Sequence, residues 1–336
     1  MMQGIPDVSI VIAAYNAADT IGRAISGALA QQGVMLEVIV ADDCSTDGTR
    51  DVVGAIADPR LRLVALTENR GPGGARNAGI DVSRGRWIAV LDADDSMRPD
   101  RLACMIGKAE AESAQIVVDN LAVVETDGGS RAMFDEHQLA TSPELTLSAF
   151  IESNVLFRSQ HNFGYMKPVF SRQFLAAQGL RFDENLKIGE DYLLLASALA
   201  AGGKCVVDPA IGYLYHITEG SISRVLKVAD VETMIAADAE FLRRYRLDGK
   251  ALAAQRRRRR SLEQARSFLT MIEHLKRCSL VRALGTAFRD PVALRHLGMP
   301  ITARLQRLKN LLLTTRPVET FSKQANPAKG PHTSKG

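Results

Sequence analysis

Short apolar runs alternate with segments of helical spacing through the first hundred residues. Four of the runs are uninterrupted, and they are VSIVIA (8–13), EVIVA (37–41), LRLVAL (61–66) and WIAVL (87–91). Continuous apolar runs of this length are typical of strands covered on both faces. The segments between them predict helices within 16–32, 49–57 and 73–83. Repeated strand–helix units of this kind predict an α/β fold with a mainly parallel sheet flanked by helices.

The pattern changes after Pro99. A helix is predicted near 99–113, and the run AQIVVDNLAVV (114–124) alternates less cleanly, which suggests a mixed part of the sheet. Residues 127–160 are polar and irregular. The elements expected next are a strand at 163–170, a short helix at 171–179, a helix at 190–203 and a strand or hairpin at 204–217. A helical extension is predicted from Val228 to Arg316, and the composition of 317–336 predicts a disordered tail.

Composition narrows the class of protein. The chain has 336 residues, 46% of them hydrophobic, so it can bury a sizeable core. We expect neither a signal peptide nor a membrane span, because no stretch approaches the roughly 18 apolar residues that a span needs. The cysteines are scattered without a CxxC pair: Cys44, Cys104, Cys205 and Cys278. This spacing favours a reduced, cytoplasmic protein without a zinc site.

The formal net charge of +4 conceals an uneven distribution. Residues 1–250 hold 24 Lys and Arg against 34 Asp and Glu, a net charge of −10. Residues 251–316 hold 15 against 3, a net charge of +12. An acidic body therefore carries a basic segment, and we expect the two parts to contact different partners.

Polar residues follow each of the first four predicted strands. They are Tyr15–Asn16, Asp42–Asp43, the segment ENRGPGGARNAG (68–79) and Asp92-Ala-Asp-Asp (92–95). The carboxyl ends of parallel strands meet at one edge, which is where open α/β sheets bind ligands. Helix capping is the alternative for Asn16 and Asp47. Four clusters that converge on one edge favour a binding site.

The glycine-rich segment does not match known phosphate loops. Arg76 stands where GxGxxG needs its third glycine, and no GK[ST] follows, so dinucleotide and P-loop fingerprints are excluded. Glycines such as Gly73 still allow a ligand to approach the backbone. Arg76 adds a cation suited to a phosphate or a base edge. A plain tight turn would explain the glycines but not the arginine.

Asp92 and Asp94 follow a predicted buried strand. In an extended segment, residues i and i+2 point to the same side, so the two carboxylates could face one point. Clustered carboxylates suit a hard divalent cation that also contacts substrate phosphates. The motif alone is weak evidence for a metal site, because it is short and frequent. Its position on the same edge as Asp42, Asp43 and Arg76 favours such a site.

Five ordered motifs carry a family resemblance: VSIVIAAYN, EVIVADDCSTDGT, NRGPGGARNAG, WIAVLDADD and FDENLKIGEDYLL. Together, over about residues 6–225, they resemble family 2 glycosyltransferases of the GT-A fold, a Rossmann-like nucleotide-diphospho-sugar transferase fold. Within that family the chain is most similar to bacterial succinoglycan-biosynthesis glucosyltransferases. The resemblance implies a GT-A domain at 1–225, with a nucleotide-binding half (1–98) and an acceptor and catalytic half (99–225). A basic extension at 226–316 and the tail at 317–336 would follow it.

The resemblance also implies roles for individual residues. The nucleotide would be held by Ala14, Tyr15, Asn16, Asp42, Asp43, Gly73 and Arg76, and Mn²⁺ or Mg²⁺ by Asp92 and Asp94. Asp95 would orient the sugar or the loop. Cys44 stands where the family often has glycine, and we expect it to affect only the turn geometry.

A second carboxylate pair, Glu190–Asp191, begins a predicted helix. Both residues could simply complement the helix N-terminus. The resemblance implies that Glu190 and Asp191 are catalytic, with Asp191 as the general base of an inverting transfer. His216 could bind the metal or the diphosphate or be structural, and Ser221, Ser223 and Arg224 weakly resemble a phosphate-side loop. The chain lacks the QxxRW motif of processive synthases, so we expect one sugar to be added per encounter.

The basic segment includes Arg256 to Arg260 followed by apolar residues at helical spacing. A solvated basic face is one interpretation. Nucleic acid is not expected as a partner, because no stacking platform or base-reading motif is present. An anionic membrane surface fits better, with the enzyme peripheral on the inner face of the plasma membrane. The expected donor is UDP-glucose and the expected acceptor an oligosaccharide on polyprenyl diphosphate. A catalytically inactive nucleotide-sugar-binding or scaffold protein is the alternative function.

Overall fold

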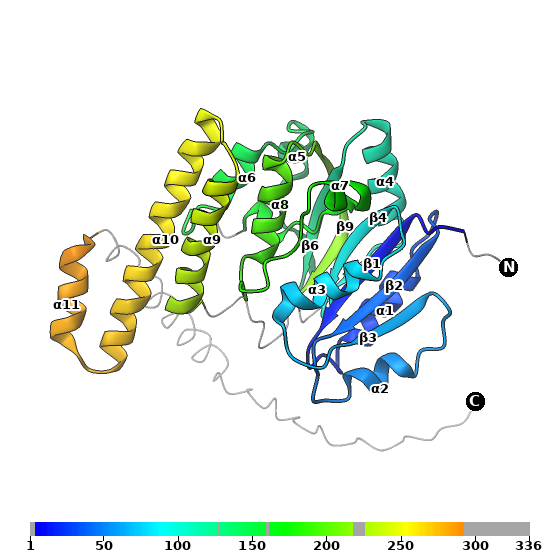
Figure 1. Ribbon diagram of the computed structural model, residues 1–336, viewed down its shortest axis with the longest axis horizontal. Helices are drawn as coiled ribbons and strands as arrows, with labels where there is room; N and C mark the ends of the chain where they lie inside the picture. Colours follow the sequence, from blue (N-terminus) through cyan, green and yellow to red (C-terminus); the bar gives the residue numbers. More distant parts are fainter. Residues whose placement is uncertain (1–3, 126–127, 159–160, 218–225, 292–336) are drawn as a thin grey trace, which may run out of the picture.

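The computed structural model describes residues 4–125, 128–158, 161–217 and 226–291. A single sheet runs through the body of the molecule, with strand order β3-β2-β1-β4-β8-β6-β9-β5 and β7 paired to β6. The strands are β1 (Val8–Ala14), β2 (Leu36–Asp42), β3 (Leu61–Ala65), β4 (Trp87–Asp92), β5 (Ser96–Met97), β6 (Ile116–Val124), β7 (Ser130–Ala132), β8 (Val169–Ser171) and β9 (Cys205–His216). Figure 1 shows this sheet with the helical C-terminal region on one flank.

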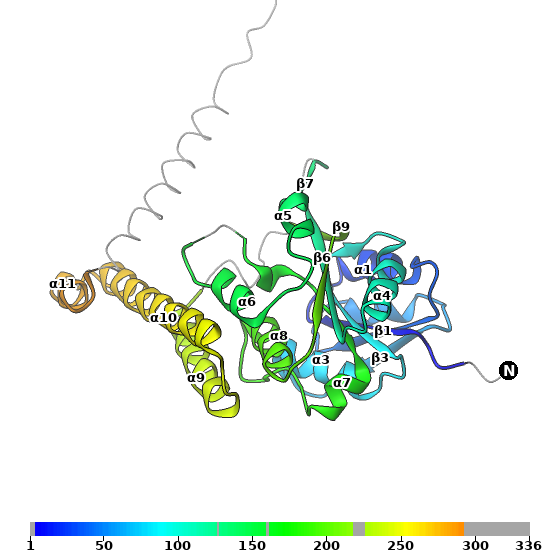
Figure 2. The same cartoon turned by 90° about the horizontal axis from the view of Figure 1, so that it is seen from above.

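Helices cover both faces of the sheet and form the C-terminal region. They are α1 (Ile21–Leu29), α2 (Thr49–Gly54), α3 (Gly71–Asp81), α4 (Arg101–Ala111), α5 (Glu136–Ala140), α6 (Leu147–Ser153), α7 (Arg172–Ala177), α8 (Glu190–Ala200), α9 (Val228–Arg244), α10 (Gly249–Lys276) and α11 (Leu280–Arg289). Figure 2 shows α1 and α4 on one face and α3, α7 and α8 on the other. The predicted α/β fold with a flanked, mainly parallel sheet and a helical C-terminal region is confirmed.

The N-terminal half is parallel, as its apolar runs predict. β1 pairs with β2 so that Ala14 lies opposite Asp42, and with β4 so that Ala13 lies opposite Asp92. The chain moves from β1 outward through β2 and β3, and then β4 returns to the other side of β1. A reversal of strand order of this kind opens a crevice at the carboxyl ends of the strands, where open α/β sheets bind ligands.

The second half of the sheet is mixed. β8 runs antiparallel to β4 and β6, whereas β6 and β9 are parallel. The strand predicted at 163–170 is wrong over most of its length, because Phe163–Tyr165 form a 3₁₀ turn and only the final residues join β8. That turn is capped by Asn162, whose side chain accepts a hydrogen bond from the Gly164 amide at 2.9 Å.

Residues 127–160, which were expected to be irregular, contain β7, α5 and α6. The two helices have 5 and 7 residues, too few for an apolar period to stand out. Side-chain caps specify them instead. Asp135 accepts a hydrogen bond from the Gln138 amide, and Thr146 accepts one from the Ala149 amide.

The helical C-terminal region packs against the body through α9 and α10. An apolar cluster joins Val231 and Met234 of α9 to Leu262 and Ala265 of α10 and to Leu186. The interpretation of residues 256–260 as a solvated basic face does not hold for Arg258. Its side chain is buried, pairs with Asp238 at 3.1 Å and lies over the ring of Tyr192.

The C-terminal part of the predicted helix, 292–316, and the tail at 317–336 lie outside the described residues. Among the residues that the structure describes, no helix combines the length and the apolar character that crossing a membrane requires.

Candidate active site

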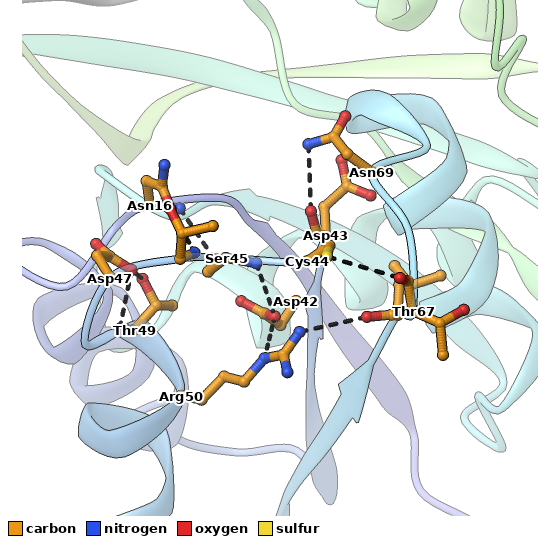
Figure 3. A network of polar contacts seen from close by, with 12 residues as sticks. Asn16, Asp42, Asp43, Cys44, Ser45, Asp47, Thr49, Arg50, Thr67 and Asn69 are labelled. Carbon is orange, nitrogen blue, oxygen red and sulfur yellow. Dashed lines mark hydrogen bonds and ion pairs between the residues drawn. The ribbon is translucent and has the colours of Figure 1, made fainter.

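The carboxyl ends of β1 and β2 are joined by hydrogen bonds between their loops (Figure 3). The Asn16 side chain accepts a hydrogen bond from the Thr46 amide at 2.9 Å, and the Asn16 amide donates to Ser45 Oγ at 3.0 Å. Asp47 accepts from the Ala18 amide at 3.1 Å. Asn16 and Asp47 therefore link two loops. Tyr15, in the same segment, is 49% exposed and available to a ligand.

Asp42 and Asp43 lie buried at the end of β2. One oxygen of Asp42 accepts from Arg50 Nε at 2.5 Å and from the Ser45 amide at 3.2 Å. The other oxygen, Oδ1, is buried and has no hydrogen-bond partner among the described residues. Asp43 accepts from the Arg70 amide at 2.7 Å, and burial raises its pKa above the ordinary value. A buried acceptor without a donor calls for one from a ligand or water.

Cys44 has a φ of +62°, in the left-handed region that favours glycine. Its thiol lies 3.7 Å from the Thr67 carbonyl oxygen in the network of Figure 3. The turn after β2 thus has a conformation that explains why a glycine would be common at this position.

Gly73 makes a close approach to the protein's own backbone. The glycine-rich segment is the start of α3 and not a loop before it, because α3 begins at Gly71. A Cβ atom on Gly73 would lie 2.7 Å from the Asp183 carbonyl oxygen, and one on Gly79 would lie 2.5 Å from Val11 Cγ1. The missing side chain of Gly73 lets α3 pack against the segment that precedes α8, and its contact with a nucleotide stays a prediction.

Arg76 joins the two carboxylate motifs that the sequence singled out. Its guanidinium lies 2.8 Å from Asp92 Oδ1, 2.7 Å from Glu190 Oε1 and 2.9 Å from Asp191 Oδ1. The side chain is only 6% exposed, and it lies over the ring of Phe182. α3 therefore supplies the cation that holds the end of β4 next to the start of α8.

Lys167 provides a second bridge, which the sequence did not predict. Its ammonium group lies 2.7 Å from Asp92 Oδ2 and 2.8 Å from Asp191 Oδ2. Arg76, Asp92, Lys167, Glu190 and Asp191 together form what we call the charged cluster. The one available signal was a lone lysine inside the apolar segment FGYMKPVF.

The charged cluster keeps Asp92 ionised. Burial acts to raise the pKa of Asp92, but Lys167 and Arg76 outweigh it and hold this pKa well below its usual range. Burial raises the pKa of Glu190, with a further contribution from Asp191. The Asp191 side chain is 21% exposed and that of Glu190 is 9% exposed. Asp191 is thus the more accessible carboxylate of the pair.

Asp95 fastens the loop after β4. Its carboxylate is fully buried, accepts a hydrogen bond from the Tyr213 hydroxyl at 2.7 Å and accepts another from the His216 amide at 2.9 Å. The same Tyr213 oxygen accepts from the Asp92 amide at 3.2 Å. Of the two roles expected for Asp95, these contacts favour orienting the loop. His216 Nε2 lies 2.9 Å from Ser96 Oγ, and Ser221, Ser223 and Arg224 lie outside the described residues.

The three expected metal ligands differ in how well they fit a cation. Each oxygen of Asp92 contacts a cationic side chain, and its role as a metal ligand stays a prediction. Burial lowers the pKa of His216, and the charge of Asp94 acts against this shift. The described residues hold no group of three or more His, Cys, Asp or Glu placed to bind a metal ion. An ion here would therefore need donor phosphates or water to complete its ligands, an arrangement common for Mg²⁺.

Comparisons with known proteins identify the family of this chain. The family model described as "Glycosyl transferase family 2" matches residues 9–174. The chain is 66% identical over 304 residues to the succinoglycan biosynthesis protein ExoO of Rhizobium meliloti (strain 1021), covering 90% of this chain and 87% of that protein. It is 30% identical over 217 residues to an Escherichia coli UDP-Glc:alpha-D-GlcNAc-diphosphoundecaprenol beta-1,3-glucosyltransferase, WfaP, covering 64% and 79%.

Solved structures of glycosyltransferases share the fold. Staphylococcus aureus TarS 1–349 in complex with UDP has a TM-score of 0.55 at 19% identity, covering 80% of this chain and 71% of that one. The mannosyltransferase PcManGT from Pyrobaculum calidifontis, in complex with GDP-Man and Mn²⁺, has a TM-score of 0.58 at 19% identity, covering 89% and 81%. With its matched motifs, its GT-A-like fold and a relative that is alike over nearly the whole chain, this protein belongs to glycosyltransferase family 2.

Proposed function

We propose that this protein transfers one sugar, glucose from UDP-glucose, to a lipid-linked oligosaccharide during synthesis of a succinoglycan-like exopolysaccharide. The observation that carries the proposal is the position of Asp191. This partly exposed carboxylate at the start of α8 is linked through Arg76 and Lys167 to Asp92 at the end of β4. The names of ExoO and WfaP support the polysaccharide, the donor and the acceptor.

In this proposal the nucleotide lies across the ends of β1 and β2. The buried Oδ1 of Asp42 would accept a hydrogen bond from the base edge or from a water bound to it. Tyr15 would pack against the base, because its ring is exposed next to the buried Ala14. Asp43 and Asn16 would shape the site by fixing the loops on either side of it.

Asp94 is the carboxylate that we propose for a divalent ion, Mn²⁺ or Mg²⁺, with His216 as a second candidate ligand. Bound there, the ion would offset the negative charge of the donor diphosphate. Asp92 would act on this region indirectly, through the cations that it holds.

Asp191 is the proposed general base. It would accept the proton of an acceptor hydroxyl as that oxygen forms a bond to the anomeric carbon of the donor sugar. The bond from the same carbon to the diphosphate oxygen would break, and the electron pair would leave with the nucleoside diphosphate. A single displacement inverts the configuration at that carbon. Glu190, which is more buried, would hold Arg76 in place.

The acceptor determines where the enzyme works. An oligosaccharide on polyprenyl diphosphate is fixed in a membrane, so we propose that the enzyme is peripheral on the inner face of the plasma membrane. Addition of one sugar per encounter agrees with the lack of the QxxRW motif.

A donor and acceptor screen tests the proposal. Radiolabelled nucleotide sugars are incubated with the full chain and with membranes that hold lipid-linked oligosaccharide acceptors. We expect incorporation into the lipid fraction from UDP-glucose, and none with Asp191→Asn. Binding of UDP-glucose without transfer to any acceptor would favour the nucleotide-sugar-binding or scaffold alternative.

A further inference from the structure

Helix α11 carries an apolar face that the described part of the chain leaves uncovered. The exposed fractions are 64% for Leu280, 84% for Val281, 57% for Leu284 and 82% for Phe288. Leu275, at the end of α10, is 39% exposed. Half of the large hydrophobic side chains that are exposed in the described residues therefore fall within this short segment, and we call these five side chains the α11 patch.

The spacing of these residues makes them a single stripe. Leu280, Leu284 and Phe288 are four residues apart along the helix, and Val281 lies one turn from Leu284, so all four share one side. A different side of α11 is already occupied. Ala283 and Ala287 pack against Phe268 and Met271 of α10. Figures 1 and 2 both show α11 outermost, on the side of α10 that faces away from the sheet.

The charge around the α11 patch is mainly positive. Residues 273–290 contain four Lys and Arg against Glu273 and Asp290, and the four are Lys276, Arg277, Arg282 and Arg289. At about 100° per residue, Arg289 and Arg282 lie about 80° and 100° around the helix from Val281, on the polar side of α11. An apolar stripe with a basic polar side is the pattern of helices that lie in the interface of an anionic bilayer.

Two other partners would complement this surface poorly. A second copy that contacts it with the same face would bring a second segment of net positive charge near the first. Residues 292–316 of the same chain also carry basic residues and no Asp or Glu. Like charges disfavour both of these contacts, whereas anionic headgroups neutralise the cations as the stripe leaves water.

We propose that the α11 patch docks the enzyme on an anionic lipid surface. Leu280, Val281, Leu284 and Phe288 would enter the headgroup region, and Arg282 and Arg289 would contact the headgroups. The proposal deepens the proposed function, on which it rests for a reason to approach a membrane, but the surface itself is argued from α11. It replaces the run 256–260 as the expected contact, since Arg258 is buried and Arg257 pairs with Glu152 at 2.7 Å.

Fluorescence of a Phe288→Trp variant of the full chain tests the occupant of the α11 patch. The one native tryptophan, Trp87, is buried, so the unsubstituted protein supplies the background signal. Phosphatidylcholine vesicles with phosphatidylglycerol should shift the added tryptophan's emission to the blue and protect it from an aqueous quencher. Phosphatidylcholine vesicles alone should do neither, and high salt should reverse the effect.

The same measurement without vesicles tests the competing occupants. An emission that is already blue-shifted and protected would mean that the chain's own segment or a second copy covers the face. Light scattering then separates these two cases by mass. Either result overturns the proposal.

Paired variants test the residues. Val281→Ser/Phe288→Ser should bind anionic vesicles at least about tenfold more weakly, because two apolar side chains no longer leave water. The control Ile5→Ser/Met35→Ser removes two side chains that are 69% and 58% exposed on the body and should bind as the native chain does. Equal binding by both pairs would overturn the proposal.

Sugar transfer is followed separately, so that the two proposals can fail independently. Vesicle binding is measured without donor, and transfer to a soluble acceptor analogue should be the same for the α11 variants and the native chain. Vesicle binding without any transfer would contradict the proposed function alone. Transfer to the lipid-linked acceptor without α11-dependent binding would contradict the docking surface alone.

Discussion

The ammonium group of Lys167 lies 2.8 Å from Asp191 Oδ2. The proposed base is therefore held in place by a lysine from the segment just before β8. The same ammonium group also contacts Asp92 at the end of β4. Burial acts to lower the pKa of Lys167, but Asp191 and Asp92 outweigh it and raise this pKa, which keeps the side chain charged. Lys167 thus couples the proposed acceptor side of the site to its donor side.

Lys167→Met should slow transfer and lower stability together. Loss of one cation leaves three carboxylates with Arg76 alone. We expect kcat to fall by at least about tenfold as Asp191 loses its fixed position, and the free energy of unfolding to fall by about 1–3 kcal/mol. Lys167→Arg should recover part of kcat, because it restores the charge. Lys204→Met, which removes an exposed lysine, is the control; equal kcat in both Met variants would contradict the positioning role.

Asp191→Asn should abolish transfer while donor binding persists, because the base acts on the acceptor hydroxyl. Loss of general-base catalysis costs about 10²–10⁴-fold in rate. Initial rates and calorimetry with UDP measure the two effects. Asp81→Asn, at the exposed end of α3, serves as the matched substitution. A rate above about a tenth of the native one would remove Asp191 from the role of base.

Asp94→Asn should weaken the metal-dependent part of nucleotide affinity. We expect calorimetry with UDP to give tighter binding with Mn²⁺ than with EDTA for the native chain, and a much smaller difference for the variant. Asp92→Asn should act differently: it should lower stability, since Arg76 and Lys167 lose a shared partner. Native affinity for UDP that does not depend on a metal would contradict the proposed role of Asp94.

Cys44→Gly should stabilise the protein slightly or leave its stability unchanged. The positive φ of Cys44 costs about 1–2 kcal/mol in a residue with a Cβ. The greater backbone freedom of glycine in the unfolded chain offsets about 0.5–1 kcal/mol of that gain. The same change at Cys104, inside α4, should lower the free energy of unfolding by between a few tenths of a kcal/mol and about 1 kcal/mol. Denaturant titration of both variants checks the sign, and a large loss at Cys44 would show that its thiol contact matters more than the turn.

Predictions from the sequence were best for elements that a local pattern of residues determines. β1, β2 and β4 are continuous apolar runs, so the sequence alone predicts these strands and places Asp42 and Asp92 at one edge of the sheet. α5 and α6 were missed because caps, and not periodicity, specify them. Lys167 was missed because its partners lie on other elements, so that only the folded chain brings them together.

Arg256 and Arg258 differ in environment although they belong to one run of identical residues. The sequence RRRRR alone does not predict which arginine faces α9 and which faces water. Arg258 is 2% exposed, its Nη1 donates to the Asn154 carbonyl oxygen at 2.9 Å, and its guanidinium lies 3.6 Å from the centre of the Tyr192 ring. Arg256 is exposed on the same helix. The position on α10 decides the role.

Arg258→Gln and Arg256→Gln should therefore differ in stability, although the sequence change is the same. Loss of Arg258 leaves the buried Asp238 without its cation, which costs about 3–5 kcal/mol for a buried pair. Arg256→Gln should stay within about 0.5 kcal/mol of the native chain.

Burial already raises the pKa of Asp238 in the native chain, and loss of Arg258 should raise it further. A carboxyl whose folded pKa exceeds its unfolded pKa makes folding more favourable as pH falls through the folded value. Denaturant titration should thus show the deficit of Arg258→Gln shrinking from pH 7 toward pH 5, and a deficit that is equal at both pH values would mean that lost packing, and not the unpaired carboxylate, causes it.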